Sequence, residues 1–576
     1  MRVGVGRRLV ALLSRARYPN VVVDPPPAGV TRTPDLAVPM PDGTMLRLDL
    51  YLPDPGSAGE AAHLARRPRS GSPTPGRYPV IMCAHPYGKD NLPINTRSGR
   101  SPSPQYRAFR QPQPVRFSAW TGWEAPDPAF WCSRGFAVVN ADLRGFGHSD
   151  GVADLLTTSE SQDYQHLIEW VADQRWCNGR VGLLGVSYLA LSQYGVAARH
   201  PRGLYAMCPW EGFSDVYRDF ARPGGGREDG FMVMWSAMTA RAGRVMTPLR
   251  ESQKDHPLLD GFWRQRTPDL AAIDTPMLVC GSFSDHLLHS RGSHEAFRRV
   301  GSADKWLYTH RGGKWCTFYS RGALAVQHEF FEDYLADIDT GWRQQPRVRL
   351  ALHRDRTDHD VIGVEDMPPP ATSMRSVRLA AGQVVGGSPW ARDVVDLDMT
   401  ERGSRGTISI SWRVDQGLDV VGSPWLELPV AVTSGDDAIL FAGLRLFRRG
   451  REVTFEGSYG FAHDMVTHSQ IRLSHHELDS DLSAPDLPVH RHDQASPLEP
   501  GRVVDVALAL LPQATALEID DVLRLDLSGR WFLPTNPVTG QFPGRYQPSP
   551  AAQIRLHLSR ARLHLPVWDQ RPRADR

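Results

Sequence analysis

A single serine stands at the junction between an apolar run and a segment with helical spacing. Residues 181–194 read VGLLGVSYLALSQY, so Ser187 follows a predicted buried strand and precedes a predicted helix. A serine there can act as a nucleophile if an imidazole takes its proton and a carboxylate orients that imidazole. The common pattern around such a serine is G-x-S-x-G, but Leu189 occupies the position of the last glycine. A helix N-cap is the competing interpretation of Ser187.

Two more residues with suitable chemistry follow predicted strands. Asp285 comes after PMLVCGSF, and His310 closes KWLYT. Either could have an ordinary role, as a helix N-cap or a surface histidine. The chain order Ser, Asp, His is that of α/β-hydrolases, and three strand ends in this order predict a catalytic triad of Ser187, Asp285 and His310. Three competing histidines are assigned to the helix after Asp285 and not to a strand end: His286, His289 and His294.

The surrounding segments predict the elements that would position these side chains. Short apolar strands alternate with helices, which is typical of a parallel sheet covered on both faces. A hairpin is predicted over 37–52, and helices over 161–174 and 188–200. The predicted strands cover residues 78–84, 135–142, 180–187, 203–210, 275–283 and 304–310.

Three segments depart from this rhythm. Residues 88–128 are polar and irregular and are interpreted as a surface excursion over the site. Residues 211–272 have helical spacing and are interpreted as a cap. Beyond residue 340 the apolar positions alternate at period two, which indicates an all-β sandwich or jelly roll. The predicted domains are therefore a core of 30–210 and 273–340, a helical cap of 211–272 and a jelly roll of 341–576.

Composition excludes several classes of function. Among 576 residues, 66 Lys and Arg nearly balance 64 Asp and Glu, so no nucleic-acid or membrane partner is indicated. No apolar run is long enough for a transmembrane helix, and the basic N-terminus has too short an apolar core for a secretory signal. The six cysteines form no C-x-x-C pair, so we expect free thiols in a cytoplasmic protein. The histidine clusters HSRGSH and RLSHH lack partners at metal-binding spacing, and no nucleotide motif occurs, so neither metal nor cofactor is predicted.

The segments GVSYLALSQY, AHPYGKDN and ADLRGFGHSDG together resemble the CocE/NonD-type hydrolases, the cocaine esterase and X-prolyl dipeptidyl aminopeptidase group. That group carries G-x-S-Y-x-G, so Leu189 is ordinary for it and Ala190 is the departure, for which we expect a small packing adjustment. The N-terminal hairpin and the C-terminal β region extend the resemblance over most of the chain. It implies an α/β-hydrolase core, an inserted helical cap and a C-terminal jelly roll.

The resemblance also implies roles for individual residues. Tyr87 in HPYGKD matches the tyrosine whose hydroxyl helps to form the group's oxyanion hole, and the backbone N–H of Tyr188 would be the second donor. Arg144 matches a turn residue and is expected to be structural. His310 transfers less directly, because the group's histidine follows a G-P-W-x-H-like stretch and THRGGKW has its histidine about three places early. Four aromatic residues are candidates for a substrate pocket, with plain packing as the alternative: Trp210, Phe213, Trp235 and Phe283.

Three functions are compatible with these observations. A serine hydrolase that cleaves small carboxylic esters is favoured. An X-Pro dipeptidyl aminopeptidase or an amino-acid ester hydrolase would use the same triad on a short peptide or amino-acid ester, and Glu211 and Asp215 are the candidates to grip its ammonium group. A non-catalytic jelly-roll binding protein is the third. The sequence does not identify the natural substrate or the size of its acyl group. The resemblance is compatible with a homodimer.

Overall fold

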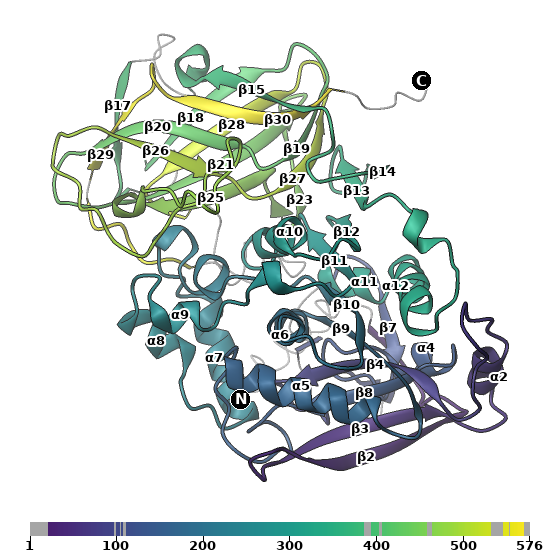
Figure 1. The fold of residues 1–576 in the computed structure, drawn as a ribbon. Coiled ribbons are helices and arrows are strands. Elements are labelled where there is room, and N and C mark those ends of the chain that lie inside the picture. The colour runs from purple at the N-terminus through teal and green to yellow at the C-terminus, as the bar shows by residue number, and fades with distance from the viewer. Residues whose placement is uncertain are drawn as a thin grey trace, which may run out of the picture.

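The chain folds into an α/β part followed by an antiparallel β part, stacked one above the other in Figure 1. The computed structural model describes residues 21–569 except 97–98, 104, 107–110, 385–392, 402–405, 458–462, 532–544 and 552. The basic N-terminal segment and the last residues of the predicted jelly roll, 570–576, lie outside the described residues. The predicted fold class, an α/β-hydrolase-type core followed by an antiparallel β domain, is confirmed.

A mixed sheet forms the centre of the α/β part. Its strands from β8 to β13 run parallel, while β2, β3 and β14 at the two ends pair antiparallel with their neighbours. Each strand of this central, parallel region is hydrogen-bonded to the next, so the sheet is continuous from one end to the other. In spatial order the strands are β2 (Val30–Pro39), β3 (Met45–Pro53), β8 (Ala137–Asp142), β4 (Tyr78–His85), β9 (Cys177–Val186), β10 (Leu204–Trp210), β11 (Met277–Ser282), β12 (Lys305–His310), β13 (Val348–His353) and β14 (His359–Val364).

Helices cover both faces of this sheet, as the strand–helix rhythm predicts. Successive strand residues point to opposite faces, so Gly182 and Gly185 of β9 face opposite sides. A methyl group on Gly182 would lie 2.5 Å from Leu335, whereas one on Gly185 would lie 2.5 Å from Leu189. The two glycines therefore allow close approach of helices on both faces. The helices of this part are α2 (Ala58–Leu64), α4 (Pro128–Cys132), α5 (Thr158–Ala172), α6 (Tyr188–Ala197), α10 (Ser290–Arg299), α11 (Lys314–Phe318) and α12 (Arg321–Leu335).

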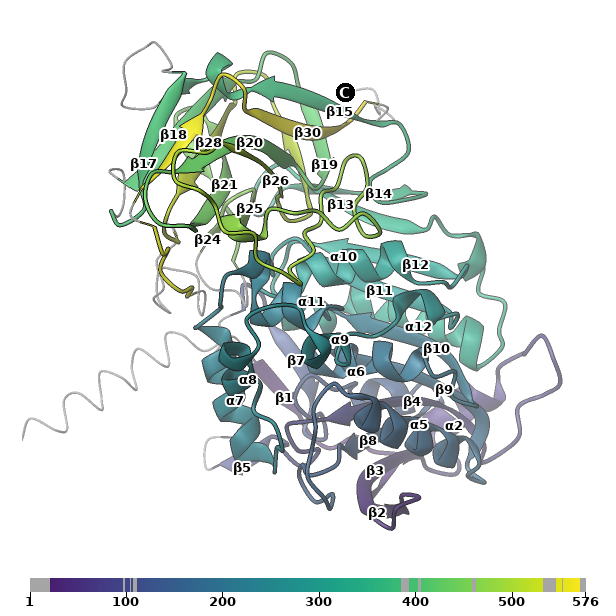
Figure 2. The ribbon, with the colours of Figure 1, turned by 60° about the vertical axis from the view of Figure 1, so that its left-hand side comes forward.

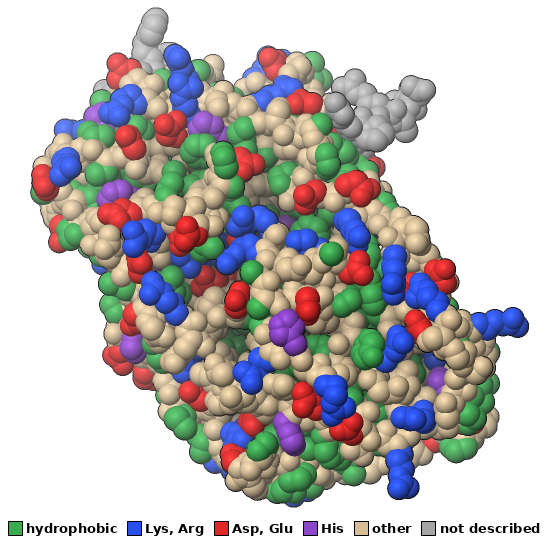
Figure 3. Space-filling model, in the orientation of Figure 1, with side chains coloured by type: hydrophobic (Ala, Val, Ile, Leu, Met, Phe, Trp, Pro, Cys, Tyr) green, Lys and Arg blue, Asp and Glu red, His purple; other side chains and the backbone are tan. Residues whose placement is uncertain are grey.

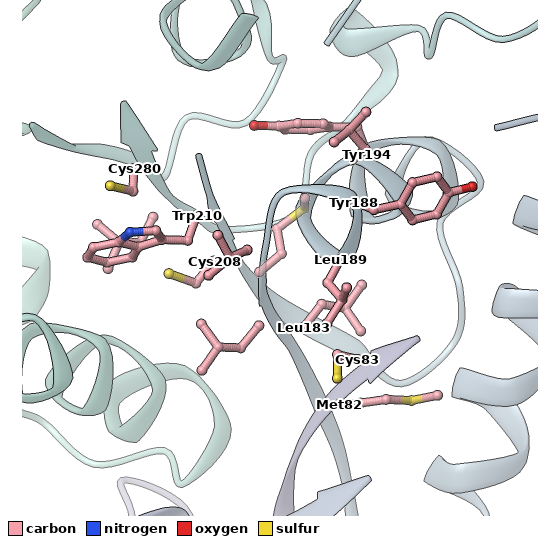
Figure 4. Close-up of a cluster of buried hydrophobic side chains, with 14 of the residues drawn as sticks. Met82, Cys83, Leu183, Tyr188, Leu189, Tyr194, Cys208, Trp210 and Cys280 are labelled. Atoms are coloured by element: carbon pink, nitrogen blue, oxygen red, sulfur yellow. The ribbon is translucent and has the colours of Figure 1, made fainter. Parts of the chain in front are cut away.

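Helix α6 is buried over almost its whole length, which fixes the position of the serine at its start. Figure 4 shows Leu189 of α6 above Leu183, with Met82 and Cys83 of the neighbouring strand below. The methyl group of Ala190 is fully buried, and it fits because residue 212 is glycine: a Cβ at Gly212 would lie 2.7 Å from it.

The segment between β10 and β11 is helical, as the composition of 211–272 predicts. It begins with a π-helix, and Figure 1 shows α7, α8 and α9 gathered at one side of the sheet. Its elements are η1 (Val216–Ala221), η2 (Pro223–Gly225), α7 (Phe231–Ala242), α8 (Leu249–Asp255), α9 (Gly261–Arg264) and η3 (Leu270–Ala272).

The prediction that 88–128 is a surface excursion is wrong for its second half. Strand β7 (Val115–Ser118) pairs in parallel with β1 (Val21–Asp24), and β5 (Ile94–Thr96) pairs with β6 (Gly99–Ser101). Phe117, Trp123 and Glu124 are then buried, with exposures of 1%, 4% and 2%. The ring of Trp123 packs against Tyr106 and against Trp315 of α11, so this half of the segment belongs to the core despite its polar composition.

Two antiparallel sheets form the C-terminal part and enclose a second apolar core. One sheet contains β15 (Thr372–Arg378), β17 (Val394–Asp398), β19 (Leu418–Gly422), β20 (Trp425–Val432), β26 (Val504–Ala509), β27 (Gln513–Leu517), β29 (Gln553–His557) and β30 (Arg562–Trp568). The other contains β16 (Gln383–Val384), β18 (Thr407–Arg413), β21 (Ile439–Arg448), β22 (Arg451–Val453), β25 (Thr467–Arg472) and β28 (Val522–Ser528), and β23 (Phe455–Glu456) pairs separately with β24 (His463–Asp464).

The two parts are joined by both backbone and side chains. Strand β13 pairs with β12 and also meets β27, through His353 and Thr515. The guanidinium of Arg311, in the loop after β12, donates to the carbonyls of Met465 and Val466 at 2.7 Å. Figure 2 shows α10 beneath the β part, and the Gln470 side chain of β25 donates to the carbonyl of Pro223 in the 211–272 segment at 2.9 Å. The junction is therefore packed and hydrogen-bonded.

The surface and the cysteines agree with the composition. Acidic and basic side chains are interspersed over the face in Figure 3, as a balanced charge leads one to expect. All six cysteines are free and buried. None of the helices in the described ranges combines the length and apolar character that a membrane crossing requires.

The Ala190–Gly212 contact yields a reciprocal stability prediction. Gly212→Ala should lower the free energy of unfolding by about 1–3 kcal/mol, because two methyl groups would then compete for one space. Ala190→Gly alone should cost about 1 kcal/mol through helix propensity, yet combined with Gly212→Ala it should recover part of the loss. Chemical denaturation of the four proteins measures this, and strictly additive effects would contradict the contact.

Candidate active site

Ser187 occupies a sharp turn between β9 and α6. Its backbone has φ 59° and ψ −118°, a conformation that costs energy for any residue with a Cβ. The turn is held because the Ser187 N–H donates to the carbonyl of Trp210 on β10 at 3.1 Å. The side chain is placed at the end of the sheet, 8% exposed, and it does not cap α6. The competing N-cap interpretation is therefore not what the structure shows.

An imidazole and a carboxylate lie in line with the serine hydroxyl. His289 Nε2 is 3.3 Å from Ser187 Oγ, and His289 Nδ1 is 2.5 Å from Asp285 Oδ2. In the tautomer that carries its proton on Nδ1, the Nδ1–H donates to the carboxylate. Nε2 is then the acceptor for the serine hydroxyl. Both residues are at most 1% exposed, and the His289 ring stacks on Phe213.

Lys314 is the third group at this carboxylate. Its ammonium nitrogen lies 2.7 Å from Asp285 Oδ2 and 2.9 Å from His289 Nδ1, with the side chain 1% exposed. Burial alone would raise the pKa of Asp285, but the charges of Lys314 and His289 lower it well below its usual range. Asp285 is thus held ionised in a buried setting.

The same lysine affects the imidazole. Burial lowers the pKa of His289, Lys314 lowers it further, and Asp285 and Glu211 act in the opposite direction without reversing the shift. The neutral imidazole, which can accept a proton, is therefore the favoured form at neutral pH.

The prediction that His310 completes this arrangement is not borne out by its contacts. Its Nε2 lies 3.1 Å from Glu211 Oε1, and its Nδ1 accepts from the N–H of Gly312 at 3.2 Å. Both ring nitrogens are thereby engaged, one as donor and one as acceptor, and neither is left for Ser187. His289 takes the place beside the serine because a helical turn after Asp285 brings residues i and i+4 to one side.

The sequence contained the signal for His289. The pattern places His286, His289 and His294 on the helix after Asp285, and a search limited to strand ends passes over them. His289 precedes the first residue of α10, and its N–H bonds to the Asp285 carbonyl at 3.1 Å. An Asp-x-x-x-His spacing at a strand end is enough to pair the two side chains. Lys314 had no comparable signal, because its carboxylate partners come from other loops.

Two groups are placed to bind an oxyanion next to Ser187. The Tyr87 hydroxyl accepts from Trp235 Nε1 at 3.1 Å and also interacts with the Ser187 side chain. Burial, with a contribution from Glu124, raises the pKa of Tyr87, so its proton stays available for donation. Tyr188 is the first residue of α6, where backbone N–H groups have no intrahelical acceptor. The ring of Tyr188 is anchored by its hydroxyl, which donates to Glu160 at 2.6 Å.

The four candidate pocket aromatics divide into two pairs. Trp235 reaches Tyr87, and Phe213 reaches His289, so both border the reactive groups. Trp210 instead packs beside Tyr308 and His310, and Figure 4 shows its ring next to Cys208 and Cys280 in the core. Phe283 stacks on His294 and is fully buried. The last two fit the plain packing interpretation.

Two buried acids complete the surroundings. Burial raises the pKa of Glu124 to about 8, although Lys314 and the Trp315 indole act in the opposite direction. The Trp315 indole donates to Glu124 at 3.0 Å. Glu211 accepts from His310 and from the Ser282 hydroxyl at 3.0 Å. Glu124 was missed because its segment was read as a surface loop.

The predicted turn residue Arg144 binds Asp163 and Asp42 and has the structural setting expected of it.

Comparison with known proteins gives family matches to both parts of the chain. Residues 42–255 match the family described as X-Pro dipeptidyl-peptidase (S15 family), and residues 340–562 match the X-Pro dipeptidyl-peptidase C-terminal non-catalytic domain. The cocaine esterase of a Rhodococcus species is 29% identical over 35% of this chain. A putative Xaa-Pro dipeptidyl-peptidase of Bacillus cereus is 23% identical over 43% of this chain. The aligned regions span only 28% and 47% of those two proteins.

Solved structures extend the likeness to the whole chain. A CocE/NonD family hydrolase from Staphylococcus aureus superimposes with a TM-score of 0.82 at 30% identity, covering 93% of this chain and 94% of its own. An aminopeptidase from a marine sediment archaeon shares the fold, with a TM-score of 0.65 at 15% identity over 94% of this chain and 97% of its own. The fold and the serine at its turn define an α/β-hydrolase. The chain belongs to the CocE/NonD family of serine hydrolases.

Proposed function

We propose that this hydrolase cleaves carboxylic esters through an acyl-enzyme on Ser187. The observation that carries the proposal is the continuous contact from Ser187 Oγ through His289 to Asp285, at 3.3 and 2.5 Å. Such a chain of groups makes a serine hydroxyl a nucleophile at neutral pH. His289 replaces His310 as the proposed base.

In the first half-reaction the hydroxyl oxygen of Ser187 attacks the ester carbonyl, and its proton passes to His289 Nε2. The carbonyl oxygen becomes an oxyanion, which the Tyr87 hydroxyl and the Tyr188 N–H stabilise. The imidazolium keeps its Nδ1–H bond to Asp285. It then gives the Nε2 proton to the leaving alkoxide, which departs as the alcohol and leaves the acyl group on Ser187.

In the second half-reaction water enters the place that the alcohol has left. His289 takes a proton from the water as it attacks the acyl carbonyl, and the same two donors bind the new oxyanion. The collapse of this intermediate breaks the bond to Ser187 Oγ, which recovers its proton from His289. The carboxylic acid product is released and the resting state is restored.

The two acids that could bind the ammonium group of a peptide substrate already have partners, which favours esters as the substrates. A dipeptidyl aminopeptidase must bind an ammonium group, and Glu211 and Asp215 were the candidates. Glu211 is fully buried and satisfied by His310 and Ser282. Asp215 caps η1 and pairs with Arg218 at 2.8 Å. Since both acids already have partners, neither is poised for an incoming ammonium group. X-Pro dipeptide release, with the same triad, is the second candidate. It is favoured by the match of residues 42–255 to the X-Pro dipeptidyl-peptidase family and of residues 340–562 to the non-catalytic domain of such enzymes.

The substrate class is tested with paired substrates. We expect turnover of p-nitrophenyl acetate or butyrate with kcat/KM well above that for Gly-Pro-p-nitroanilide, and a loss of roughly 10³-fold or more in Ser187→Ala. Ser192→Ala is the matched control, because Ser192 is also buried on α6 but has no hydrogen-bond partner for its hydroxyl among the described residues. Faster turnover of the anilide would favour the peptidase, and an active Ser187→Ala protein would refute the nucleophile.

The base is tested by comparing two histidines. His289→Gln should lower kcat/KM for the ester by roughly 10³-fold or more, because the amide cannot accept a proton from Ser187. His310→Gln should change it by less than about tenfold, since a glutamine amide can still donate to Glu211. Steady-state kinetics on both proteins decide between the assignments, and the reverse ranking would restore His310.

The effect of Lys314 is tested through pH. The groups that face His289 are Asp285, Glu211 and Lys314, and Lys314 is the one of them that lowers the pKa of the imidazole. Lys314→Met should therefore raise the pKa of His289, so that the imidazole remains protonated to higher pH. The acidic limb of the pH profile of kcat/KM should move to higher pH, whereas Lys314→Arg should leave it nearly in place. An unmoved limb in Lys314→Met would show that the ammonium does not tune the base.

A further inference from the structure

Three buried side chains meet at the junction between the α/β part and the β part. His286 follows Asp285 in the loop before α10, Asp464 ends β24, and His468 lies on β25. One ligand atom from each lies within 4.8 Å of the others. Figure 2 shows α10 beneath the β part to which these strands belong. None of the three has a place in the ester mechanism.

The hydrogen bonds of His286 leave an acceptor facing an acceptor. Its Nε2 lies 3.1 Å from the carbonyl oxygen of Pro512, which can only accept, so Nε2 carries a proton. In the neutral ring Nδ1 then has a lone pair, yet it lies 3.0 Å from Asp464 Oδ2. A proton on the ring, a proton on the carboxyl or a metal cation must therefore lie in this contact. A backbone carbonyl that fixes one nitrogen is also the usual support for a histidine that binds a metal through the other.

His468 distinguishes these alternatives. Its Nε2 is buried with no hydrogen-bond partner among the described residues, and it lies 4.0 Å from Asp464 Oδ1. An extra proton on His286 would do nothing for this orphaned nitrogen. A metal ion between the three residues would satisfy all of them at once.

We propose that His286 Nδ1, Asp464 and His468 Nε2 bind one divalent ion of the zinc type. Two imidazoles and a carboxylate are ligands that Zn²⁺ accepts, at bond lengths of about 2.0–2.2 Å that place neighbouring ligand atoms about 3.3 Å apart. His286 Nδ1 lies 3.0 Å from Asp464 Oδ2, and His468 Nε2 lies 4.0 Å from Oδ1 of the same carboxylate, so modest side-chain shifts would bring the three groups to that spacing. A cavity of about 40 Å³ borders both histidines and has room for a water molecule as the fourth ligand.

Two cations oppose metal binding, because Arg311 and Arg445 both act electrostatically on His468. Arg311 interacts electrostatically with Asp464, and burial lowers its pKa to about 9. Its guanidinium donates to the carbonyls of Met465 and Val466, however, and so does not occupy the carboxylate oxygens. Asp464 keeps Oδ2 for the ion, because the N–H of Met465 binds Oδ1 at 2.8 Å. The affinity should therefore be moderate and should depend on all three ligands.

The proposed ion would tie the β part to the loop that carries Asp285. His286 adjoins Asp285, and the other two ligands belong to β24 and β25. Its role would be structural, since Ser187 is held by a separate set of contacts. The site does not depend on the proposed ester function.

The full-length protein, stripped with a chelator and dialysed, is the material for the test. Competition with a chromophoric chelator should show one Zn²⁺ per chain, and Co²⁺ should give visible absorption typical of nitrogen and oxygen ligation. Zn²⁺ should also raise the Tm of the stripped protein. No saturable binding by the wild-type chain would overturn the proposal, and this measurement needs no variant to fold.

Variants then locate the ion. His468→Gln and Asp464→Asn should each weaken Zn²⁺ binding by at least about 100-fold, which is the upper end of what a lost supporting contact alone produces. His463→Gln is the matched control, because His463 is exposed, adjoins Asp464 and bonds to Arg356. Unchanged affinity in the two ligand variants, or an equal loss in the control, would place the ion elsewhere and refute the site.

Discussion

The reactive centre depends on one carboxylate that is kept charged without contact with water. Asp285 is 1% exposed, and a buried carboxylate with no partner would take up a proton and lose its hold on His289. The ammonium of Lys314 at 2.7 Å offsets that tendency. The cost is that the same ammonium repels the imidazolium, so the base is weakened while its partner is secured. A buried pair of this kind is costly to break, because either partner would be left alone in a medium of low polarity.

The elements supply this centre from four consecutive strand ends of one parallel sheet. Ser187 follows β9, Glu211 follows β10, Asp285 follows β11, and Lys314 follows β12. Parallel strands end at the same edge, so residues more than a hundred positions apart in the chain meet there. His310 has both ring nitrogens hydrogen-bonded, to Glu211 and to Gly312, and its ring is thereby fixed. His289, in the loop after β11, faces Ser187 instead.

The sequence predicted what repeats and missed what is specific to this chain. Hydrophobic periodicity is a local property of the sequence. It predicted the strand ends at Ser187 and Asp285, the helices after them and the β-rich C-terminus. The sequence favours His310 because it closes a strand, whereas the structure places His289 beside Ser187 through the helical turn that follows Asp285. The partners of Lys314, and the contact of His286 with Asp464, join loops distant in the chain, and no pattern in a single sequence reveals such a contact. The buried Glu124 was hidden by the polar residues around it.

Strand β13 belongs to the sheets of both parts, through Leu307 and Tyr308 on one side and Thr515 on the other. The β part is consequently not an independent addition to the α/β part, because the two share a strand. Ending the chain near residue 340 would strip the parallel sheet of its neighbour and bare the backbone donors and acceptors of β12, an invitation to self-association. The two parts of this chain should therefore fold and unfold as one cooperative unit.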